Sequence, residues 1–353
     1  MKDITFIMSV CNTKEKWLRR SINSVIAQSR RTWDLIIVDD GSGIETAKFL
    51  DEYAAKDDRI NIYHQENKGL SSARNYGMDN ARSQWVAFLD ADDWIEFNYV
   101  ERVMEVLTMH PELELLGIGH DDIWGNKKID RLWGISEFYQ YSSADKKDIQ
   151  MSLLQEPSGL DKQPVFFGAQ WKFIYSLAFL NKYGIRNNPA VLKAQDSVFN
   201  LYVSEYMKKA GYYNKVLYHY FHNNASVTGG GFNNNIVKKL QTLVEARREA
   251  LEDIGKFSDP EYKSAWVKNA LLEMETMLSS YFLNKNKMDS SNKRRDIMLE
   301  VLSNEPYKTA ISCECSGLSL YRRLLLKMMR LKSYTGICIL YRFKKRLSRV
   351  SGK

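Results

Sequence analysis

Proline, cysteine and long apolar runs are all scarce in this 353-residue sequence. With 6 prolines, 44% apolar residues and 12% aromatic residues, the composition excludes low-complexity and disordered proteins and indicates an ordered globular one. No stretch reaches the roughly 18 apolar residues that a transmembrane helix needs, and the short run at residues 4–10 is unlike a signal peptide. We therefore expect a cytoplasmic protein, and its length predicts about two domains.

The few cysteines argue against a structural metal site or a disulfide framework. They are Cys11, Cys313, Cys315 and Cys338. Cys313 and Cys315 lack the second pair of ligands that would complete a zinc site. Because no export signal is visible, free thiols in a reducing compartment are the expected state.

Acidic residues are absent from residue 316 to the end of the sequence, where 11 Lys or Arg occur. The net charge is +8, yet the remaining chain carries 40 basic against 43 acidic residues. Such a distribution argues against a nucleic-acid-binding protein and favours one localised anionic partner.

The basic tail, residues 316–353, mixes bulky apolar residues with cations at 320–331 and again at 337–347. Basic amphipathic helices of this kind bind anionic membranes, which favours a peripheral protein at the inner face of the cell membrane. A terminal helix pair that packs on the core and exposes a solvated basic face explains the same pattern, so both interpretations stay open.

The first hundred residues alternate strand and helix patterns. Strands are predicted at 4–10, 33–38, 59–63 and 85–89, with helical patterns at 18–26, through 49–53 and at 71–81 between them. Repeated βα units indicate a largely parallel sheet with helices on both faces. Ligands of such sheets bind beyond the carboxyl ends of the strands, where the acidic turns at 39–40 and 90–93 fall.

The rest of the chain is less regular. A strand is predicted at 113–119, a helix at 197–209 and an aromatic strand at 212–221, whereas 120–165 resists assignment. Glycines at 229–231 and asparagines at 233–235 mark a domain boundary, and helical patterns follow from 236. We expect an α/β domain over residues 1–230 and a mostly α-helical domain over 231–353.

Three carboxylates, Asp90, Asp92 and Asp93, follow the fourth strand within four positions. Like charges this close raise one another's pKa, and a divalent cation relieves that cost. Oxygen ligands suit Mg²⁺ or Mn²⁺. The alternative is an acidic turn that caps the helix beginning near residue 97.

Four motifs in order make the signal more specific. They are FIMSVCN (6–12), DLIIVDDGS (34–42), NKGLSSARN (67–75) and FLDADDW (88–94). Together they resemble the family 2 glycosyltransferases of the GT-A fold over roughly the first 230 residues. The resemblance implies an inverting, metal-dependent transfer of a sugar from a UDP-sugar donor to a saccharide or lipid-linked acceptor, in the synthesis of a surface polysaccharide.

The resemblance also implies roles for individual residues in donor and metal binding. Asp40 would accept the uracil N3–H, with Ser9 beside the same base, and a carboxylate suits that donor edge. Lys68 and Arg74 would face the diphosphate or uracil. Asp90 and Ala91 would contact the donor, and Asp92 and Asp93 would bind Mn²⁺ or Mg²⁺.

Residues on the acceptor side are implied in the same way. Asp196, in KAQDSVFN (193–200), matches the family's catalytic base, although Gln195 replaces the usual Glu. The alternative role for Asp196 is the N-cap of the following helix. Trp94 and Trp171 are candidate acceptor contacts. His222 is a candidate phosphate or metal contact, because Phe221 stands where many relatives carry a basic residue.

Other classes of protein fit less well. Nucleotidyl transfer would need a Gly- and Arg-rich loop after the first strand, and a dinucleotide-dependent oxidoreductase would need GxGxxG there; neither is present. A non-enzymatic GT-A fold, acting as a carbohydrate-binding or scaffold module, stays open because of Gln195 and Phe221.

Overall fold

Two compact units make up the chain, one holding β1 to β10 and the other the helices from α8 onward. The structure, a computed structural model, describes residues 2–133, 136–154, 168–223, 235–284 and 289–350, and side chains up to residue 347. The boundary that the sequence predicts at 230/231 lies outside these residues.

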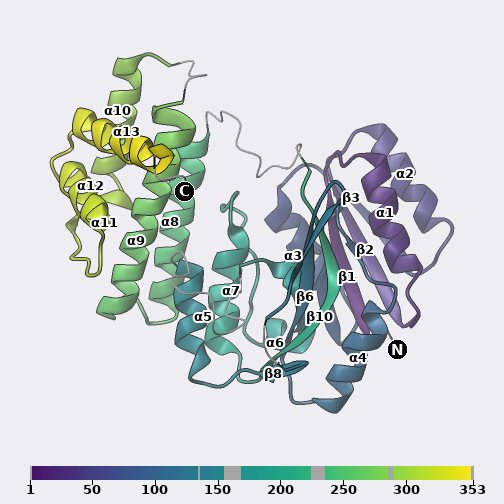
Figure 1. Cartoon of the computed structure of the whole chain (residues 1–353). Coiled ribbons are helices and arrows are strands. Elements are labelled where there is room, and N and C mark those ends of the chain that lie inside the picture. Colours follow the sequence, from purple (N-terminus) through teal and green to yellow (C-terminus); the bar gives the residue numbers. More distant parts are fainter. Residues whose placement is uncertain (1, 134–135, 155–167, 224–234, 285–288, 351–353) are drawn as a thin grey trace. The chain divides into compact units, whose positions relative to one another are not determined.

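The first unit begins with a βα repeat that matches the predicted order. Its elements are β1 (Ile4–Val10), α1 (Glu15–Ile26), β2 (Trp33–Asp40), α2 (Ile44–Ala54), β3 (Ile60–Gln65), α3 (Leu70–Asn80) and β4 (Trp85–Phe88). β1 pairs with β2 and β4, and β2 with β3, all in parallel. Right-handed crossovers put α1 and α2 on one face of the sheet and α3 on the other, as Figure 1 shows.

The remaining strands make the sheet mixed. In chain order, the elements of this part are β5 (Trp94–Ile95), α4 (Tyr99–Met109), β6 (Leu115–Trp124), β7 (Lys127–Arg131), β8 (Phe138–Gln140), α5 (Asp145–Leu154), the 3₁₀ turn η1 (Gln170–Lys172), β9 (Phe173–Ser176), α6 (Leu177–Lys182), α7 (Gln195–Tyr206) and β10 (Ala210–Phe221). The main order is β3-β2-β1-β4-β9-β6-β10-β5. β9 runs antiparallel to both β4 and β6, so the parallel arrangement predicted for the first hundred residues is confirmed there and ends at β4.

The core of this unit lies on both faces of the central strands. Every residue of β1 except Ser9 is buried, as expected for a strand covered by helices on both sides. α3 lies close to β1 because Gly77 faces it: a Cβ at that position would stand 2.4 Å from Ile7 Cγ2. Glycine therefore sets the helix–strand distance at this point.

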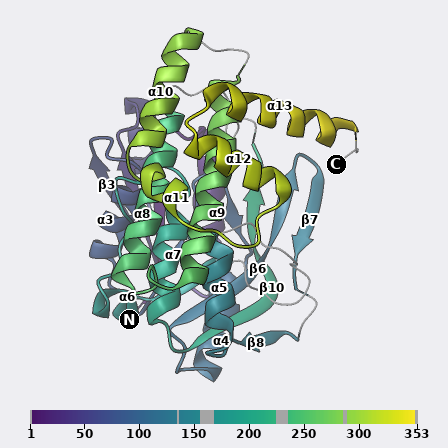
Figure 2. The same cartoon turned by 90° about the vertical axis from the view of Figure 1, so that its left-hand side faces the viewer.

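The second unit is helical in every described segment. It contains α8 (Ile236–Asp253), α9 (Pro260–Met277), the π-helical turn η2 (Leu278–Phe282), α10 (Ser291–Ser303), α11 (Tyr307–Ser312), α12 (Leu320–Arg330) and α13 (Tyr334–Val350). Figure 2 shows α8 and α9 side by side. Fully buried Trp266 joins them, since its indole N–H donates to the Val244 carbonyl at 2.8 Å. None of the described helices is both long and apolar enough to span a membrane.

Candidate functional site

The carboxyl ends of β1, β2 and β4 bring the predicted donor residues to one edge of the sheet. Ser9 is half-buried near the end of β1 and lies opposite Val38 of β2. Asp40 ends β2, and Asp90 follows β4. Parallel strands end at the same edge, so residues distant in sequence meet there.

Asp40 fastens the loop that precedes α3. Its Oδ1 accepts hydrogen bonds from Gln65 Nε2 (2.7 Å) and the Lys68 backbone N–H (2.8 Å), and its Oδ2 accepts one from the Gly69 N–H (2.8 Å). The carboxylate is buried. Its role as the acceptor of the uracil N3–H stays a prediction, because the visible role is to hold this loop; the Lys68 side chain is exposed on it.

Gly41 allows the loop before α3 to lie close to the turn after β2. Gly41 has φ of +75°, and a Cβ there would stand 2.8 Å from the Asn67 backbone nitrogen. Any other residue would be strained in the left-handed region and would push the loop away. The turn after β2 and the loop before α3 are thereby held as one wall.

Arg74 lies at the centre of the site, and its position differs from the sequence prediction. Its guanidinium donates to Asp196 Oδ1 (2.6 Å), Gln170 Oε1 (2.6 Å) and Asp90 Oδ1 (2.9 Å). The side chain is only 3% exposed, so it faces two carboxylates rather than an open diphosphate site. Burial acts to lower the pKa of Arg74, but Asp196 and Asp90 outweigh it and raise that pKa above its ordinary value.

Asp196 lies in the first turn of α7 and joins the same network. The helix begins at Gln195 with Ala194 as its N-cap, so the start predicted at residue 197 and the N-cap role considered for Asp196 are wrong. Its Oδ2 accepts a hydrogen bond from the Gln170 backbone N–H at 3.2 Å. The residue before the helix, Ala194, has φ of +52°, a strained conformation for a residue with a Cβ. The Asp196 side chain is 17% exposed. As a base it stays a prediction.

The acidic turn divides its three carboxylates between different environments. Asp90 touches Arg74, and burial, opposed by that arginine, raises the pKa of Asp90. Asp92 is half-buried and accepts a hydrogen bond from Asn223. Burial, with a contribution from Asp90, raises the pKa of Asp92 to about 6. Ala91, between them, is buried.

Asp93 does not lie where a metal ligand was predicted. It is fully buried, and its two oxygens accept hydrogen bonds from the Tyr218 hydroxyl (2.7 Å) and the Phe221 N–H (2.7 Å). Burial raises the pKa of Asp93 well above its ordinary range. These two bonds hold the carboxylate in the interior and tie the acidic turn to β10.

The carboxylates of the acidic turn fit a metal ion that is bound partly by the protein and partly by a phosphate-containing ligand. Within the described ranges, no three acidic, histidine or cysteine side chains form a complete metal site. Asp92 and Asp90 are the carboxylates that remain at the surface of the turn. Mg²⁺ is commonly held by one or two carboxylates together with substrate phosphates rather than by an all-protein cage, and the residues present fit that arrangement.

Trp94 and Trp171, the candidate acceptor contacts, lie in different places. Trp94 is half-buried, stacks on His219 (centroids 5.0 Å apart) and carries the Arg20 guanidinium over its ring at 3.7 Å. Trp171 is buried and stacks on Tyr218 at 4.3 Å. Trp94 is therefore part of the wall behind the acidic turn.

Trp171 lines a cavity of about 470 Å³, here called the aromatic cavity. The other lining residues come from β6, β7, β9, β10 and the segments around them: Ile118, His120, Asp122, Arg131, Trp133, Tyr141, Ala169, Lys172, Phe173, Tyr212 and Tyr220. Its volume is in the range of small-ligand sites. Burial lowers the pKa of Lys172 to about 7 and that of His120 to about 3.

His222 is engaged by its neighbours rather than aimed at the acidic turn. Its Nε2 lies 2.8 Å from Asp122 Oδ1, and its ring stacks on Trp124 at 4.0 Å. The side chain is about a third exposed. These contacts favour a role in positioning the end of β10, so the predicted phosphate or metal contact has no support from this geometry.

Sequence reasoning missed Tyr218, Gln170 and Arg20. Tyr218 joins Asp93 to the Asp90 N–H (3.1 Å), and Arg20 donates to the Asp92 carbonyl at 2.6 Å. Gln170 is fully buried between Arg74 and Asp196. Tyr218 and Gln170 are polar members of largely apolar segments, whereas Arg20 stands between Arg19 and Ser21 and gives no comparable signal.

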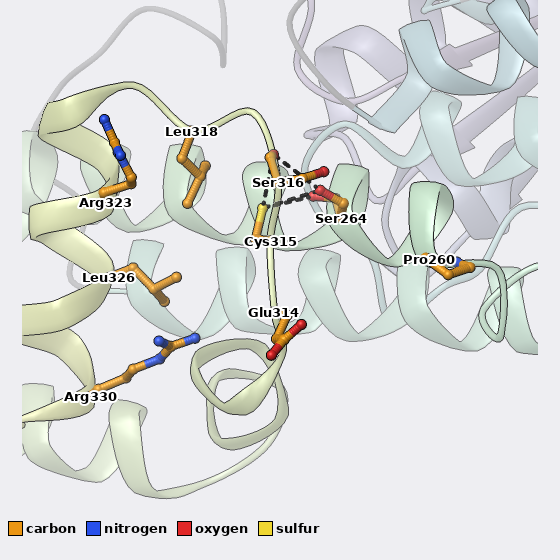
Figure 3. Close-up of a pocket in the computed structure, with 9 residues that line it drawn as sticks. All are labelled: Pro260, Ser264, Glu314, Cys315, Ser316, Leu318, Arg323, Leu326 and Arg330. Atoms are coloured by element: carbon orange, nitrogen blue, oxygen red, sulfur yellow. Dashed lines mark hydrogen bonds between the residues drawn. The ribbon is translucent and has the colours of Figure 1, made fainter.

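A second pocket, of about 590 Å³, lies within the helical unit and is shown in Figure 3. Arg330 donates to the carbonyls of Ile311 (2.6 Å) and Cys313 (2.9 Å), and Cys315 Sγ lies 3.3 Å from Ser264 Oγ. These contacts hold the segment between α11 and α12 in place. All four cysteines of the chain are free thiols.

Comparison with known proteins supports the resemblance seen in the motifs. The model of glycosyl transferase family 2 matches residues 5–157. The putative glycosyltransferase EpsH of Bacillus subtilis is 26% identical over 223 residues, 62% of this chain and 60% of EpsH. Glycosyltransferase GlyA of Streptococcus pneumoniae is 39% identical over 105 residues, 30% of this chain and 15% of GlyA. The chain thus spans well under the full length of these two relatives.

Solved structures show the same fold. S. aureus TarS 1–349, in complex with UDP-GlcNAc, superimposes with a TM-score of 0.69 at 15% identity, covering 99% of this chain and 92% of that one. The sequence match and the architecture agree. Residues 5–157 therefore match glycosyl transferase family 2, and the chain has the GT-A fold, with a helical C-terminal region.

Proposed function

We propose that this protein transfers a sugar from a UDP-sugar to a saccharide or lipid-linked acceptor in the synthesis of a surface polysaccharide. The family and the TarS complex with UDP-GlcNAc support a nucleotide-sugar donor. The observation that carries the proposal is Arg74, which joins Asp90 to Asp196. This arginine brings a carboxylate of the acidic turn and the candidate base into one hydrogen-bonded cluster.

The reaction is a single in-line displacement. The acceptor hydroxyl oxygen forms a bond to the sugar anomeric carbon, the bond from that carbon to the diphosphate oxygen breaks, and UDP leaves. Asp196 takes the hydroxyl proton. One displacement inverts the anomeric centre, and the hydrogen bond from Arg74 orients Asp196 for proton transfer.

The donor side follows from the same edge of the sheet. Ser9 and Asp40 would hold the uracil, with the loop at Lys68 beside the diphosphate. Asp92 and Asp90 would hold Mn²⁺ or Mg²⁺, which supplies neutralisation of the charge that develops on the departing diphosphate. Asp93 and Tyr218 would hold the turn in position from behind.

A donor-hydrolysis screen over nucleotide sugars, with and without Mn²⁺, tests the proposal. Asp196→Asn should bind UDP like the unmodified protein and lose turnover by roughly 10²–10⁴-fold. Asp148→Asn is the matched control, because Asp148 is likewise an acid in the first turn of a helix, α5. Full turnover by Asp196→Asn would remove it as the base. UDP binding without turnover in the unmodified protein would favour a carbohydrate-binding or scaffold module.

We also propose that the protein attaches peripherally to an anionic membrane at the inner face of the cell membrane. On α13, Ile339, Phe343 and Leu347 are spaced four apart and are 59%, 61% and 55% exposed. The opposite face is anchored, since Ile337 is buried and Lys344 pairs with Glu275 at 2.6 Å. The three apolar residues form an exposed ridge on a fixed helix.

The basic residues beside the ridge favour a membrane surface with acidic headgroups. Arg342 and Arg346 are exposed and flank Phe343. Cations beside an apolar ridge suit a bilayer with acidic headgroups, at about 1 kcal/mol per basic residue near the surface. Attachment there would place the site near a lipid-linked acceptor.

Point variants test the ridge better than a truncation, because removing residues 316–353 would also delete buried Leu325, Leu326 and Met329. Phe343→Asp should abolish sedimentation with phosphatidylglycerol vesicles. Ile44→Asp is the control, because Ile44 is 71% exposed on α2 of the other unit. Sedimentation of Phe343→Asp equal to that of the control would refute the membrane ridge.

A further inference from the structure

Arg20, a half-buried residue of α1, lies against the acidic turn without an ion pair. Its Nη2 donates to the backbone carbonyl of Asp92 at 2.6 Å. Within the described ranges this guanidinium has no carboxylate partner, whereas that of Arg74 is paired with both Asp90 and Asp196. A neutral carbonyl compensates a full positive charge less well than a carboxylate does, so Arg20 has charge to offer to an anion.

Two aromatic rings hold the guanidinium in place. Its central carbon lies 3.7 Å from the centre of the Trp94 ring and 4.6 Å from that of Phe221. Contact with ring faces stabilises the charge and leaves the N–H groups at the edge of the guanidinium available as donors. Among the described residues, the Asp92 carbonyl is the one hydrogen-bond acceptor that Arg20 reaches, and its buried Nε has no partner.

The contact with Asp92 puts Arg20 next to the expected position of the donor diphosphate. Phosphate oxygens that share a metal ion with Asp92 would lie close to that residue, which Arg20 touches. A metal ion and a guanidinium beside one residue repel each other unless an anion lies between them. A diphosphate has enough oxygens to bind both positive groups at once.

The cations that the sequence predicts for the diphosphate are less suited to it. Arg74 is enclosed by two carboxylates, and His222 contacts Asp122. The Lys68 side chain is exposed on its loop. Arg20 therefore combines what these residues lack: a half-buried position, a fixed orientation and unused donors.

We propose that Arg20 binds the diphosphate of the nucleotide-sugar donor and stabilises the charge that develops on it as UDP leaves. This inference rests on the proposed function, because it adds a residue to the same donor site. It predicts that part of the affinity for the diphosphate is independent of the metal ion.

Binding of UDP and of uridine to the full chain, in EDTA and again in Mn²⁺, tests the inference by calorimetry. The two ligands share the base and the ribose and differ in the diphosphate. One charge-assisted hydrogen bond predicts that UDP binds about tenfold or more tightly than uridine in EDTA. Arg20→Met should lower that ratio by about tenfold and leave the affinity for uridine unchanged.

Two further variants separate a phosphate contact from support of the acidic turn. Arg19→Met is the matched control, because Arg19 is the neighbouring residue on α1, is exposed and pairs with Glu15. It should leave the ratio of affinities unchanged. Arg20→Lys keeps the charge but loses the planar group, so it should retain part of the ratio.

Two results with Arg20→Met would overturn the inference. An equal loss of affinity for UDP and for uridine would mean that Arg20 only supports the acidic turn. A ratio equal to that of Arg19→Met would mean that Arg20 makes no contact with the diphosphate.

The unmodified protein separates the two proposals. If UDP binds in Mn²⁺ but is not preferred over uridine in EDTA, the role of Arg20 is wrong and the proposed function stands. If UDP binds under neither condition, the donor site itself is refuted, and the role of Arg20 with it.

Discussion

Replacing Arg74 with methionine should destabilise the first unit by about 3 kcal/mol. The change keeps an unbranched apolar stem but removes the guanidinium and its three hydrogen bonds, of 2.6, 2.6 and 2.9 Å. Removing one partner of a buried ion pair leaves a buried charge without compensation and typically costs 3–5 kcal/mol. We take the low end because Asp90 is 32% exposed and regains some water.

Guanidinium denaturation followed by tryptophan fluorescence measures this loss. Seven of the eight tryptophans lie in the first unit, and only Trp266 lies in the helical one. Arg186→Met is the control: Arg186 pairs with Asp79 at 3.0 Å on the surface, where such a pair contributes less than about 1 kcal/mol.

Two further measurements test the cause of the loss. Adding Asp196→Asn to Arg74→Met should restore part of the stability, because one of the stranded charges is removed. The difference from the unmodified protein should also shrink as the pH falls. Arg74 opposes the raised pKa of Asp90, so its removal raises that pKa further in the folded variant, and protons bound there at low pH favour folding. A loss no larger than that of Arg186→Met would refute the reasoning.

Two other predictions follow from the first unit. Gly77→Ala should destabilise it by about 1–3 kcal/mol in the same denaturation assay, because the new Cβ would overlap Ile7, although alanine is the better helix former; a stabilised variant would contradict this packing. His64 lies between Asp39 (2.8 Å) and Asp51 (3.0 Å), which raise its pKa above 6.5. Its contribution to stability should be complete below the unfolded pKa and lost as the pH rises through the higher folded pKa. An NMR titration should show the raised pKa of His64 in the unmodified protein and a lower pKa in Asp51→Asn. An unchanged pKa in the variant would contradict the interaction of His64 with Asp51.

The sequence predicted the parallel half of the sheet closely. The predicted strand at 4–10 coincides with β1, and 85–89 differs from β4 by one residue. These strands are buried on both faces, so their apolar runs are continuous and easy to recognise. The polar, exposed KKIDR of β7 carries no such run, and the two-residue β5 is too short for any periodic signal.

The site was predicted in part. The motifs identified the right edge of the sheet and the proximity of Asp196, which came from the resemblance. The contact between Arg74 and Asp196 joins residues 122 positions apart, a separation at which no local pattern operates. Asp93 points into the interior, where it accepts a hydrogen bond from Tyr218. Tyr218 lies on a strand that the sequence predicts only from its aromatic residues, with no sign of this contact.

The burial of Asp93 bears on how inactive descendants of this protein would be recognised. A descendant that abandoned catalysis would still need Asp93 to join the turn to β10, because its loss would leave the Tyr218 hydroxyl and the Phe221 N–H unsatisfied in the interior. Selection for folding alone would retain it. Retention of Asp92, whose carboxylate has no comparable burial, would be the better diagnostic of a working enzyme.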